Sequence, residues 1–339
     1  MDLAVAGHRA PIGTHLVLHT RADADAILLD GPRLGGVAAE TAERFRTPLA
    51  IPLMDLTLEK AAMLGPLGVA AGKVDGFHFD QPPGEPGKFT LTPRMRATCE
   101  AIAHVASTTS LVPLGMGIGP FSLMTKLVKD PITPVFLAGS GMTGDDEPEV
   151  AVVERCLEVG LEVILSYLSA QADAGAKAII VCEPAANLVY FSPNQLAENF
   201  EIFDRYVMSP MRRIKALLDN RGVDLVFHDC GELTNEMVSR FATLDPAMMS
   251  LGCSRNLWDD AALVPKTTVL YGNLPTKKFY SPQLTVQEVD RLSTELLEKM
   301  CAAGHPFILG SECDVLSVPG SEDEILAKVN AFMRVGAPA

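Results

Sequence analysis

The segment Val223-Asp-Leu-Val-Phe-His-Asp-Cys-Gly-Glu232 is a short apolar run that ends in His228 and Cys230. If the run is a β-strand that stays extended to its end, both side chains leave the same face at its carboxyl edge. A second apolar run, His305-Pro-Phe-Ile-Leu-Gly-Ser-Glu-Cys-Asp314, ends similarly in Cys313. An imidazole and two thiolates are typical zinc ligands, and Cys230 and Cys313 are too far apart in the chain for a local zinc finger. The pattern therefore predicts a catalytic metal site that the fold brings together.

The same residues have a simpler explanation. A cysteine at a strand end is often a small apolar core residue, and a histidine in a strand is often a hydrogen-bonded bystander. The spacing of one histidine and two cysteines leaves both interpretations open, and the positions of other polar residues have to decide between them.

Composition limits the classes of protein that remain. The chain has 339 residues, of which 48% are hydrophobic and 21% charged, which is typical of a globular protein with a large core. It lacks an apolar window long enough to span a membrane and a secretion signal at its amino terminus, which favours the cytoplasm and no membrane contact. A net charge of −14 without any basic run excludes binding to nucleic acid. The seven scattered cysteines do not form a disulfide framework, which leaves thiols available for a metal.

Apolar runs and amphipathic helices alternate along the whole chain. We expect strands at 13–19, 48–55, 133–138, 177–184, 223–230, 247–252 and 266–275, at the start of the glycine-rich segment 110–122, and in the run that ends at Cys313. This alternation is typical of parallel strands joined by helical crossovers. It predicts an α/β fold, a (β/α)8 TIM barrel that forms a single domain over residues 1–339. A doubly wound open sheet is the alternative.

Polar or sulfur-containing residues recur at the expected carboxyl ends of the strands, where the active site of a TIM barrel lies. They are Glu183, His228, Cys230, Asn273 and Cys313. Their number favours the metal interpretation. Glu183 is a candidate fourth metal ligand, or an acceptor that orients the imidazole of His228.

Other residues are candidates for substrate contacts. The turn-rich stretch 72–88 contains Phe77 and His78 and is either a loop insertion that covers the site or a surface decoration. The segment 110–122, with Met116 and Phe121, lacks the spacing of a dinucleotide-binding fingerprint and is either a substrate-facing loop or a tight turn. Tyr190, with Phe77 and Phe121, could wall a flat substrate or simply pack the loops, and Asn273 completes the set.

Several motifs together resemble the uroporphyrinogen decarboxylase superfamily, in particular its corrinoid-dependent methyltransferase branch. They are the His228-x-Cys230-Gly231 strand end, Leu270-Tyr-Gly-Asn-Leu-Pro275, Gly310-Ser-Glu-Cys313, the segment Leu53 to Gly65 and Gly119-Pro-Phe-Ser122. The resemblance implies that His228, Cys230 and Cys313 bind zinc. The arginine-rich amino-terminal segment with which the decarboxylases hold their tetrapyrrole has no counterpart here, which argues against decarboxylation of a porphyrinogen.

The resemblance implies two competing reactions. In one, the protein demethylates a small molecule and passes the methyl group to the cobalamin of a partner corrinoid protein. An aryl methyl ether is the favoured methyl donor. In the other, methylcobalamin donates its methyl group to a thiol of the coenzyme M type. A non-enzymatic corrinoid or tetrapyrrole carrier is a third hypothesis, although no Asp-x-His-x-x-Gly cobalamin-binding motif occurs. The sequence does not determine the oligomeric state, and it allows a homodimer.

Overall fold

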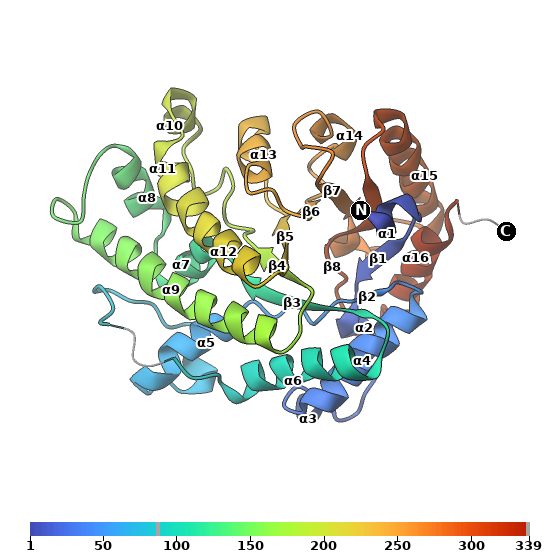
Figure 1. Ribbon diagram of the computed structural model, residues 1–339. Helices are drawn as coiled ribbons and strands as arrows, with labels where there is room; N and C mark the ends of the chain where they lie inside the picture. Colours follow the sequence, from blue (N-terminus) through green and yellow to red (C-terminus); the bar gives the residue numbers. More distant parts are fainter. Residues whose placement is uncertain (86–88, 337–339) are drawn as a thin grey trace.

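The computed structural model describes residues 1–85 and 89–336, in which eight parallel strands form a nearly closed barrel surrounded by helices (Figure 1). The strands are β1 (Arg9–Ile12), β2 (Leu49–Ala50), β3 (Val112–Ile118), β4 (Ala178–Cys182), β5 (Asp224–Asp229), β6 (Met248–Leu251), β7 (Val269–Leu274) and β8 (Phe307–Asp314). Hydrogen-bonded neighbours follow the order β1-β8-β7-β6-β5-β4-β3-β2. The two strands at the ends of this order, β1 and β2, lie close to each other. Just beyond them, the Thr14 hydroxyl donates to the carbonyl of Ile51 at 2.6 Å. The predicted TIM barrel is confirmed.

The long helices α9 and α15 lie along the outside of this barrel (Figure 1). The α-helices are α1 (Asp2–Val5), α2 (Thr14–Leu18), α3 (Ala24–Ile27), α4 (Gly31–Arg44), α5 (Leu58–Leu64), α6 (Pro93–Thr108), α7 (Pro120–Leu127), α8 (Ile132–Gly139), α9 (Pro148–Asp173), α10 (Pro193–Glu198), α11 (Glu201–Phe203), α12 (Ser209–Asn220), α13 (Asn235–Ala242), α14 (Leu257–Asp260), α15 (Val286–Ala303) and α16 (Glu322–Arg334). Among the helices described here, none is both long and apolar enough to cross a membrane.

Local capping explains where several of these helices begin. The hydroxyl groups of Thr92, Thr234 and Thr285 each accept a hydrogen bond from the backbone amide three residues later, at the starts of α6, α13 and α15. Such a cap satisfies one of the amides that a helix leaves free at its amino end. These three helices therefore start directly after their threonine caps.

Two predicted strands are wrong, because both segments are helical. Residues 13–19 contain α2, whose side chains Leu16, Val17 and Leu18 are all buried. Residues 133–138 lie in α8, where the carboxylate of Asp130 accepts from the amides of Ile132 and Thr133 and so starts the helix. Short apolar runs have no clear periodicity, and the surrounding structure decides their conformation.

Alternation along the strands separates two apolar regions. On β4 and β5, Ile180, Cys182 and Val226 point into the barrel interior, whereas Val181 and Phe227 pack against the outer helices. This period of two is the geometry of an extended strand. It decides which residues at the strand ends can face the mouth of the barrel.

The predicted loop insertion at 72–88 leaves the barrel between α5 and α6, and its residues 86–88 lie outside the described residues. The amide of Phe79 donates to the carbonyl of Leu127 at 2.8 Å, and the guanidinium of Arg155 donates to the carbonyl of Pro83 at 3.1 Å. The described part of this loop thus packs against the end of α7 and the middle of α9.

Candidate metal centre

His228 and Cys230 lie at the carboxyl end of β5. Val226, two residues before His228, faces the barrel interior, so the alternation of the strand directs His228 to the same side. His228 is 1% exposed, whereas Cys230 is only partly buried. The strand therefore places an imidazole below a thiol that is accessible from the barrel mouth.

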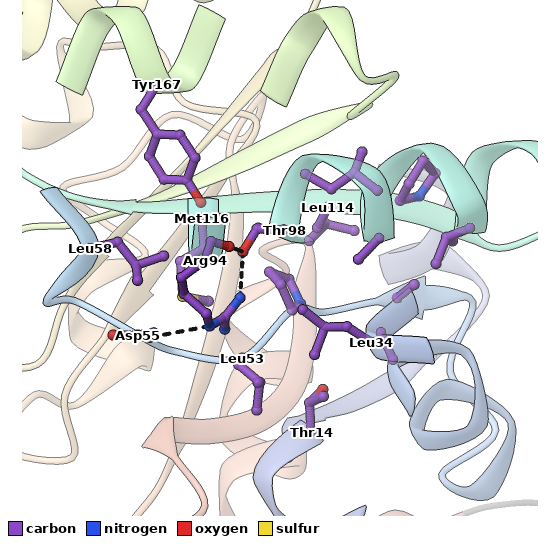
Figure 2. Close-up of a pocket in the computed structure, with 17 residues that line it drawn as sticks. Thr14, Leu34, Leu53, Asp55, Leu58, Arg94, Thr98, Leu114, Met116 and Tyr167 are labelled. Atoms are coloured by element: carbon purple, nitrogen blue, oxygen red, sulfur yellow. Dashed lines mark hydrogen bonds and ion pairs between the residues drawn. The ribbon is translucent and has the colours of Figure 1, made fainter. Parts of the chain in front are cut away.

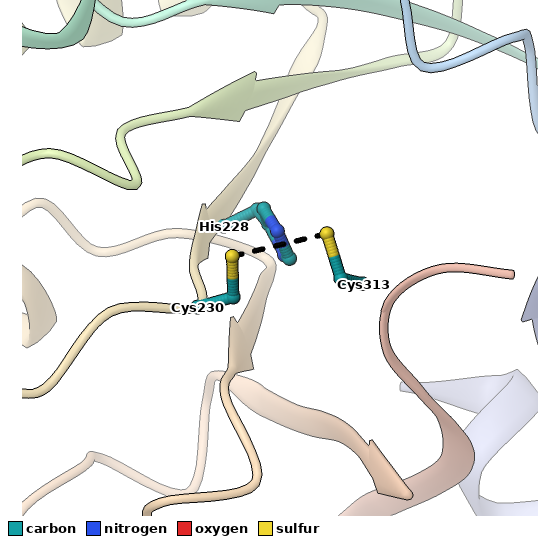
Figure 3. A group of neighbouring side chains, drawn as sticks. All are labelled: His228, Cys230 and Cys313. Carbon is teal, nitrogen blue, oxygen red and sulfur yellow. Dashed lines mark hydrogen bonds between the residues drawn. The ribbon is translucent and has the colours of Figure 1, made fainter. Parts of the chain in front are cut away.

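Cys313 reaches the same place from β8, across the barrel. The pairing of β8 with β1 is irregular here, since Ala10 pairs with Gly310 but Ile12 pairs with Asp314. Simple alternation therefore does not extend to Cys313. Its Sγ lies 3.8 Å from the Sγ of Cys230, and one ligand atom from each of the three residues lies within 4.8 Å of the others. Figure 3 shows the three side chains pointing toward one another, which is the convergence expected from the sequence.

The donor atoms fit a zinc ion. Nδ1 of His228 is hydrogen-bonded to the hydroxyl of Ser250 at 2.9 Å, while Nε2 is buried without a hydrogen-bond partner among the described residues. Metal-binding histidines have this arrangement, with one nitrogen held and the other free. Two sulfurs bound to one tetrahedral zinc at about 2.3 Å stand about 3.8 Å apart. The separation of the two cysteine sulfurs matches this value.

The two thiols and a nearby lysine are electrostatically coupled. The hydrogen bond between Cys230 and Cys313 lowers the pKa of Cys230, with further help from His228 and Lys277. The same hydrogen bond raises the pKa of Cys313. Burial acts to lower the pKa of Lys277, but the two nearby sulfurs and Glu312 outweigh it and raise the pKa. The ammonium group of Lys277 thus lies close enough to the two sulfurs to favour a thiolate there.

Glu183, the predicted fourth ligand or His228 acceptor, is not part of this group. It follows Cys182, which faces the interior, so alternation turns Glu183 to the outside of the barrel. There its carboxylate accepts from the amide of Ser122 at the start of α7, and Ser250, not Glu183, is hydrogen-bonded to His228. Burial, opposed by the backbone hydrogen bonds, raises the pKa of Glu183 to about 8.

The glycine-rich strand β3 makes room for buried polar side chains on its outer face. A Cβ on Gly115 would stand 2.3 Å from Oε1 of Gln171, and one on Gly119 would stand 1.7 Å from Oε2 of Glu183. On Gly117 it would stand 2.9 Å from Oε1 of Glu59. The three glycines are spaced by two, so they share one face of the strand. The segment is therefore neither a simple tight turn nor a substrate-facing loop on this face.

Most of the predicted substrate contacts lie elsewhere. Phe121 is fully buried and stacks on Phe191, with Tyr190 edge-on against it, so these rings pack the outer core. The side-chain amide of Asn273 donates to the carbonyls of Gly252 and Arg255 and holds the loop after β6. Met116 is the apolar member of this set that packs in the barrel interior.

Phe77 and His78 belong to the loop that packs on α7 and α9. Phe77 makes an edge-to-face contact with Phe79, and His78 is exposed. No described hydrogen bond joins this loop to His228, Cys230 or Cys313. The described part of the loop is held by α7 and α9, and the expectation that it covers the metal side stays a prediction.

Comparison with known proteins identifies the family. Residues 36–333 match the family described as Uroporphyrinogen decarboxylase (URO-D). The chain belongs to the uroporphyrinogen decarboxylase family. A curated uroporphyrinogen decarboxylase of Methylibium petroleiphilum is 26% identical over 189 residues, which are 54% of this chain and 48% of the relative. The match thus spans about half the length of that relative.

The fold is also that of a solved structure. A methyltransferase from Methanosarcina mazei superposes with a TM-score of 0.67 at 17% sequence identity, and the match covers 97% of this chain and 96% of that one. At this level of identity the likeness concerns the fold. It places this uroporphyrinogen decarboxylase family member among barrels of the same overall architecture.

A separate cavity lies between the barrel and helices α4 and α6 (Figure 2). Its walls are mostly apolar, and at one end the guanidinium of Arg94 contacts Asp55 at 3.7 Å and the Thr98 hydroxyl at 2.8 Å. Its volume is about 30 Å³, which is room for about two water molecules. This cavity is therefore too small to bind an organic substrate.

Two functional residues escaped the sequence analysis. Ser250 pairs directly with His228 in the ladder between β5 and β6, so the register of the two strands is the signal that finds it. Lys277 lies in a short 3-10 helix, Thr276–Lys278, just after β7. A cation directly after a barrel strand would have marked Lys277 as a residue of the mouth.

Proposed function

We propose that this protein is a zinc-dependent methyltransferase that moves a methyl group between a small molecule and the cobalamin of a partner corrinoid protein. The observation that carries the proposal is the convergence of His228, Cys230 and Cys313 at the carboxyl ends of β5 and β8. Three protein ligands at the open end of a TIM barrel are typical of a catalytic zinc site rather than a structural one. Family membership and the fold shared with a methyltransferase support this choice.

Each residue of the proposed centre has its own role. Cys230 and Cys313 supply soft, electron-rich sulfurs, and Ser250 holds the imidazole of His228 so that Nε2 faces the centre. Lys277 adds positive charge beside the two sulfurs. When bound, zinc supplies a Lewis acid that can polarise an ether oxygen or hold a thiol as its thiolate.

Decarboxylation of a porphyrinogen fits this chain less well. A tetrapyrrole with several carboxylates needs a cluster of free arginines. Arg9 donates to the carbonyl of Val335, Arg21 pairs with Glu40, and Arg33 pairs with Asp23. These amino-terminal arginines are thus engaged with nearby protein groups and do not converge on the barrel mouth.

The methyl donor is open between two classes. The preference for an aryl methyl ether rested on aromatic walls, but Phe121 and Tyr190 pack the outer core instead. Either a methyl ether as donor or a thiol as acceptor is compatible with the three donor atoms. Both classes share the corrinoid protein as partner.

The test is a metal analysis followed by an assay in both directions. We expect purified protein to be colourless and to contain one zinc per chain. With reduced corrinoid protein and a panel of methyl ethers, we expect the absorption spectrum of methylcob(III)alamin to appear. With methylcobalamin and thiols, the reverse change would identify the thiol as acceptor. Protein that carries the colour of a corrin and no zinc would instead support a carrier.

A further inference from the structure

A third sulfur lies beside the two cysteines. The Sδ of Met54 is 3.7 Å from the Sγ of Cys313, and Cys313 Sγ is 3.8 Å from that of Cys230. Both separations match the distance of about 3.8 Å between two sulfurs that share a tetrahedral zinc. Cys313 thus has two sulfur neighbours at ligand-to-ligand distance.

The chain after β2 directs Met54 toward the barrel mouth. Its neighbours Leu53 and Asp55 line the cavity on the outer side, between the barrel and α6. Met54 points the opposite way and packs on the residues of the barrel interior. The amide of Asp55 donates to the carbonyl of Leu53 at 3.0 Å, which forms a tight turn centred on Met54.

Contacts on both sides of Met54 fix its position. Leu53 is 7% exposed within an apolar cluster. Asp55 accepts from the hydroxyl of Thr57 at 2.7 Å and contacts Arg94 at 3.7 Å. The backbone that carries the thioether is therefore held in place on both sides of Met54.

We propose that Met54 is a fourth, displaceable sulfur ligand of the metal that His228, Cys230 and Cys313 bind, which rests on the metal centre proposed above. A thioether is a soft donor that accompanies thiolates in metal sites. It is uncharged, so two thiolates, one imidazole and one thioether balance the charge of a divalent ion. A neutral thioether binds less strongly than a thiolate, and a thiol or ether substrate can replace it at the position that catalysis requires to open.

The proposal also accounts for the position of Glu183. A carboxylate in the fourth position would leave the centre with a net negative charge. The structure places Glu183 on the other side of β3, and no other carboxylate among the described residues joins the group. A sulfur is the side-chain donor that the structure offers instead.

The test uses protein produced with selenomethionine and loaded with zinc. Selenium backscatters the photoelectron differently from sulfur, so X-ray absorption at the zinc edge distinguishes a Met54 ligand from the two cysteines. We expect one selenium neighbour in the first shell of zinc. In Met54→Leu we expect the selenium neighbour to vanish while zinc remains bound through the other three ligands.

The matched control is Met248→Leu. Met248 also packs on the barrel interior, but at the amino end of β6, away from the mouth. This variant should keep the selenium signal. Zinc with two sulfurs and no selenium in the parent protein, or a selenium signal that survives in Met54→Leu, overturns the role of Met54 alone. Parent protein that binds no zinc overturns the metal centre together with it.

Discussion

Two clusters of buried polar groups lie at the same end of the barrel and differ in almost every chemical respect. Inside the mouth, His228, Cys230 and Cys313 have donor atoms that face one another. Behind β3, the carboxyl groups of Glu59 and Glu183 accept from the backbone amides of Ile118 and Ser122. The first cluster consists of sulfur and nitrogen donors that face one another, whereas the second consists of carboxyl groups that each accept a backbone amide through one oxygen. The face of the strand, more than its end, decides which cluster can be a reactive centre.

The largest effect is expected from substitutions in the inner cluster, which is formed by His228, Cys230 and Cys313 inside the mouth. Cys230→Ser or Cys313→Ser should lose zinc and reduce methyl transfer by orders of magnitude, because the Lewis acid contributes several kcal/mol to catalysis. The barrel should stay folded, since a chain of this size has a core that is stable without a metal. Zinc content, circular dichroism and activity of the same samples check this.

The control is Cys301→Ser, which changes an exposed cysteine on α15. It should keep zinc and activity. Global unfolding of the Cys230 and Cys313 variants would make the metal structural, and full activity without zinc would remove it from the reaction.

The next largest effect is expected from a substitution in the outer cluster, which is formed by Glu59 and Glu183 behind β3. Gly119→Ala would place a Cβ 1.7 Å from Oε2 of Glu183. Overpacking of this kind costs about 1–3 kcal/mol, so the melting temperature should fall. Gly36→Ala in α4 is the matched control, because nothing lies within 4 Å of its added Cβ and alanine favours a helix. An unchanged melting temperature for Gly119→Ala would contradict the close fit behind β3.

A smaller effect sharpens the role of Ser250. Ser250→Ala removes the hydrogen bond to Nδ1 of His228. Loss of such a partner typically lowers metal affinity about 10–100-fold, because the imidazole is no longer held in its tautomer and orientation. Competition with a zinc chelator measures the affinity. Ser250→Thr, which keeps the hydroxyl, should restore part of it, and equal affinity of Ser250→Ala and the parent would exclude this positioning role.

The last prediction concerns the pH dependence of stability that comes from Glu59 behind β3. Burial is the main cause that raises the pKa of Glu59 to about 8, with Asp55 adding to it and Lys126 opposing it. Because the folded protein then holds the proton more tightly than the unfolded chain, Glu59 stabilises the fold below its ordinary pKa. That stability decreases as pH rises toward about 8, by up to about 1.4 kcal/mol per pH unit.

Glu59→Gln cannot titrate and should lack this slope. We expect the variant to gain stability relative to the parent protein between pH 5 and pH 8, in denaturant unfolding of both. Parallel stability curves for the two proteins would mean that Glu59 titrates normally.

The barrel itself was predictable from the sequence. Strands such as β4 and β5 are apolar runs between helices, and this local pattern is what a parallel barrel requires. His228 and Cys230 could be paired for the same reason, since two residues on one strand share a face wherever the strand lies. The conformation of the segments that form α2 and α8 could not be predicted, because a short apolar run fits a helix or a strand until its neighbours are in place.

The error at Glu183 was avoidable, because Cys182 and Ile180 already show by alternation that Glu183 faces outward. Three other features depend on tertiary structure alone. The irregular pairing of β8 with β1 turns Cys313 toward Cys230, the register of β6 on β5 supplies Ser250, and the path of the chain after β2 brings Met54 to Cys313. Each is a contact between distant segments, whose geometry is set by strand register and packing across the barrel. The sequence alone determined which residues can bind a metal, and the fold decided which of them meet.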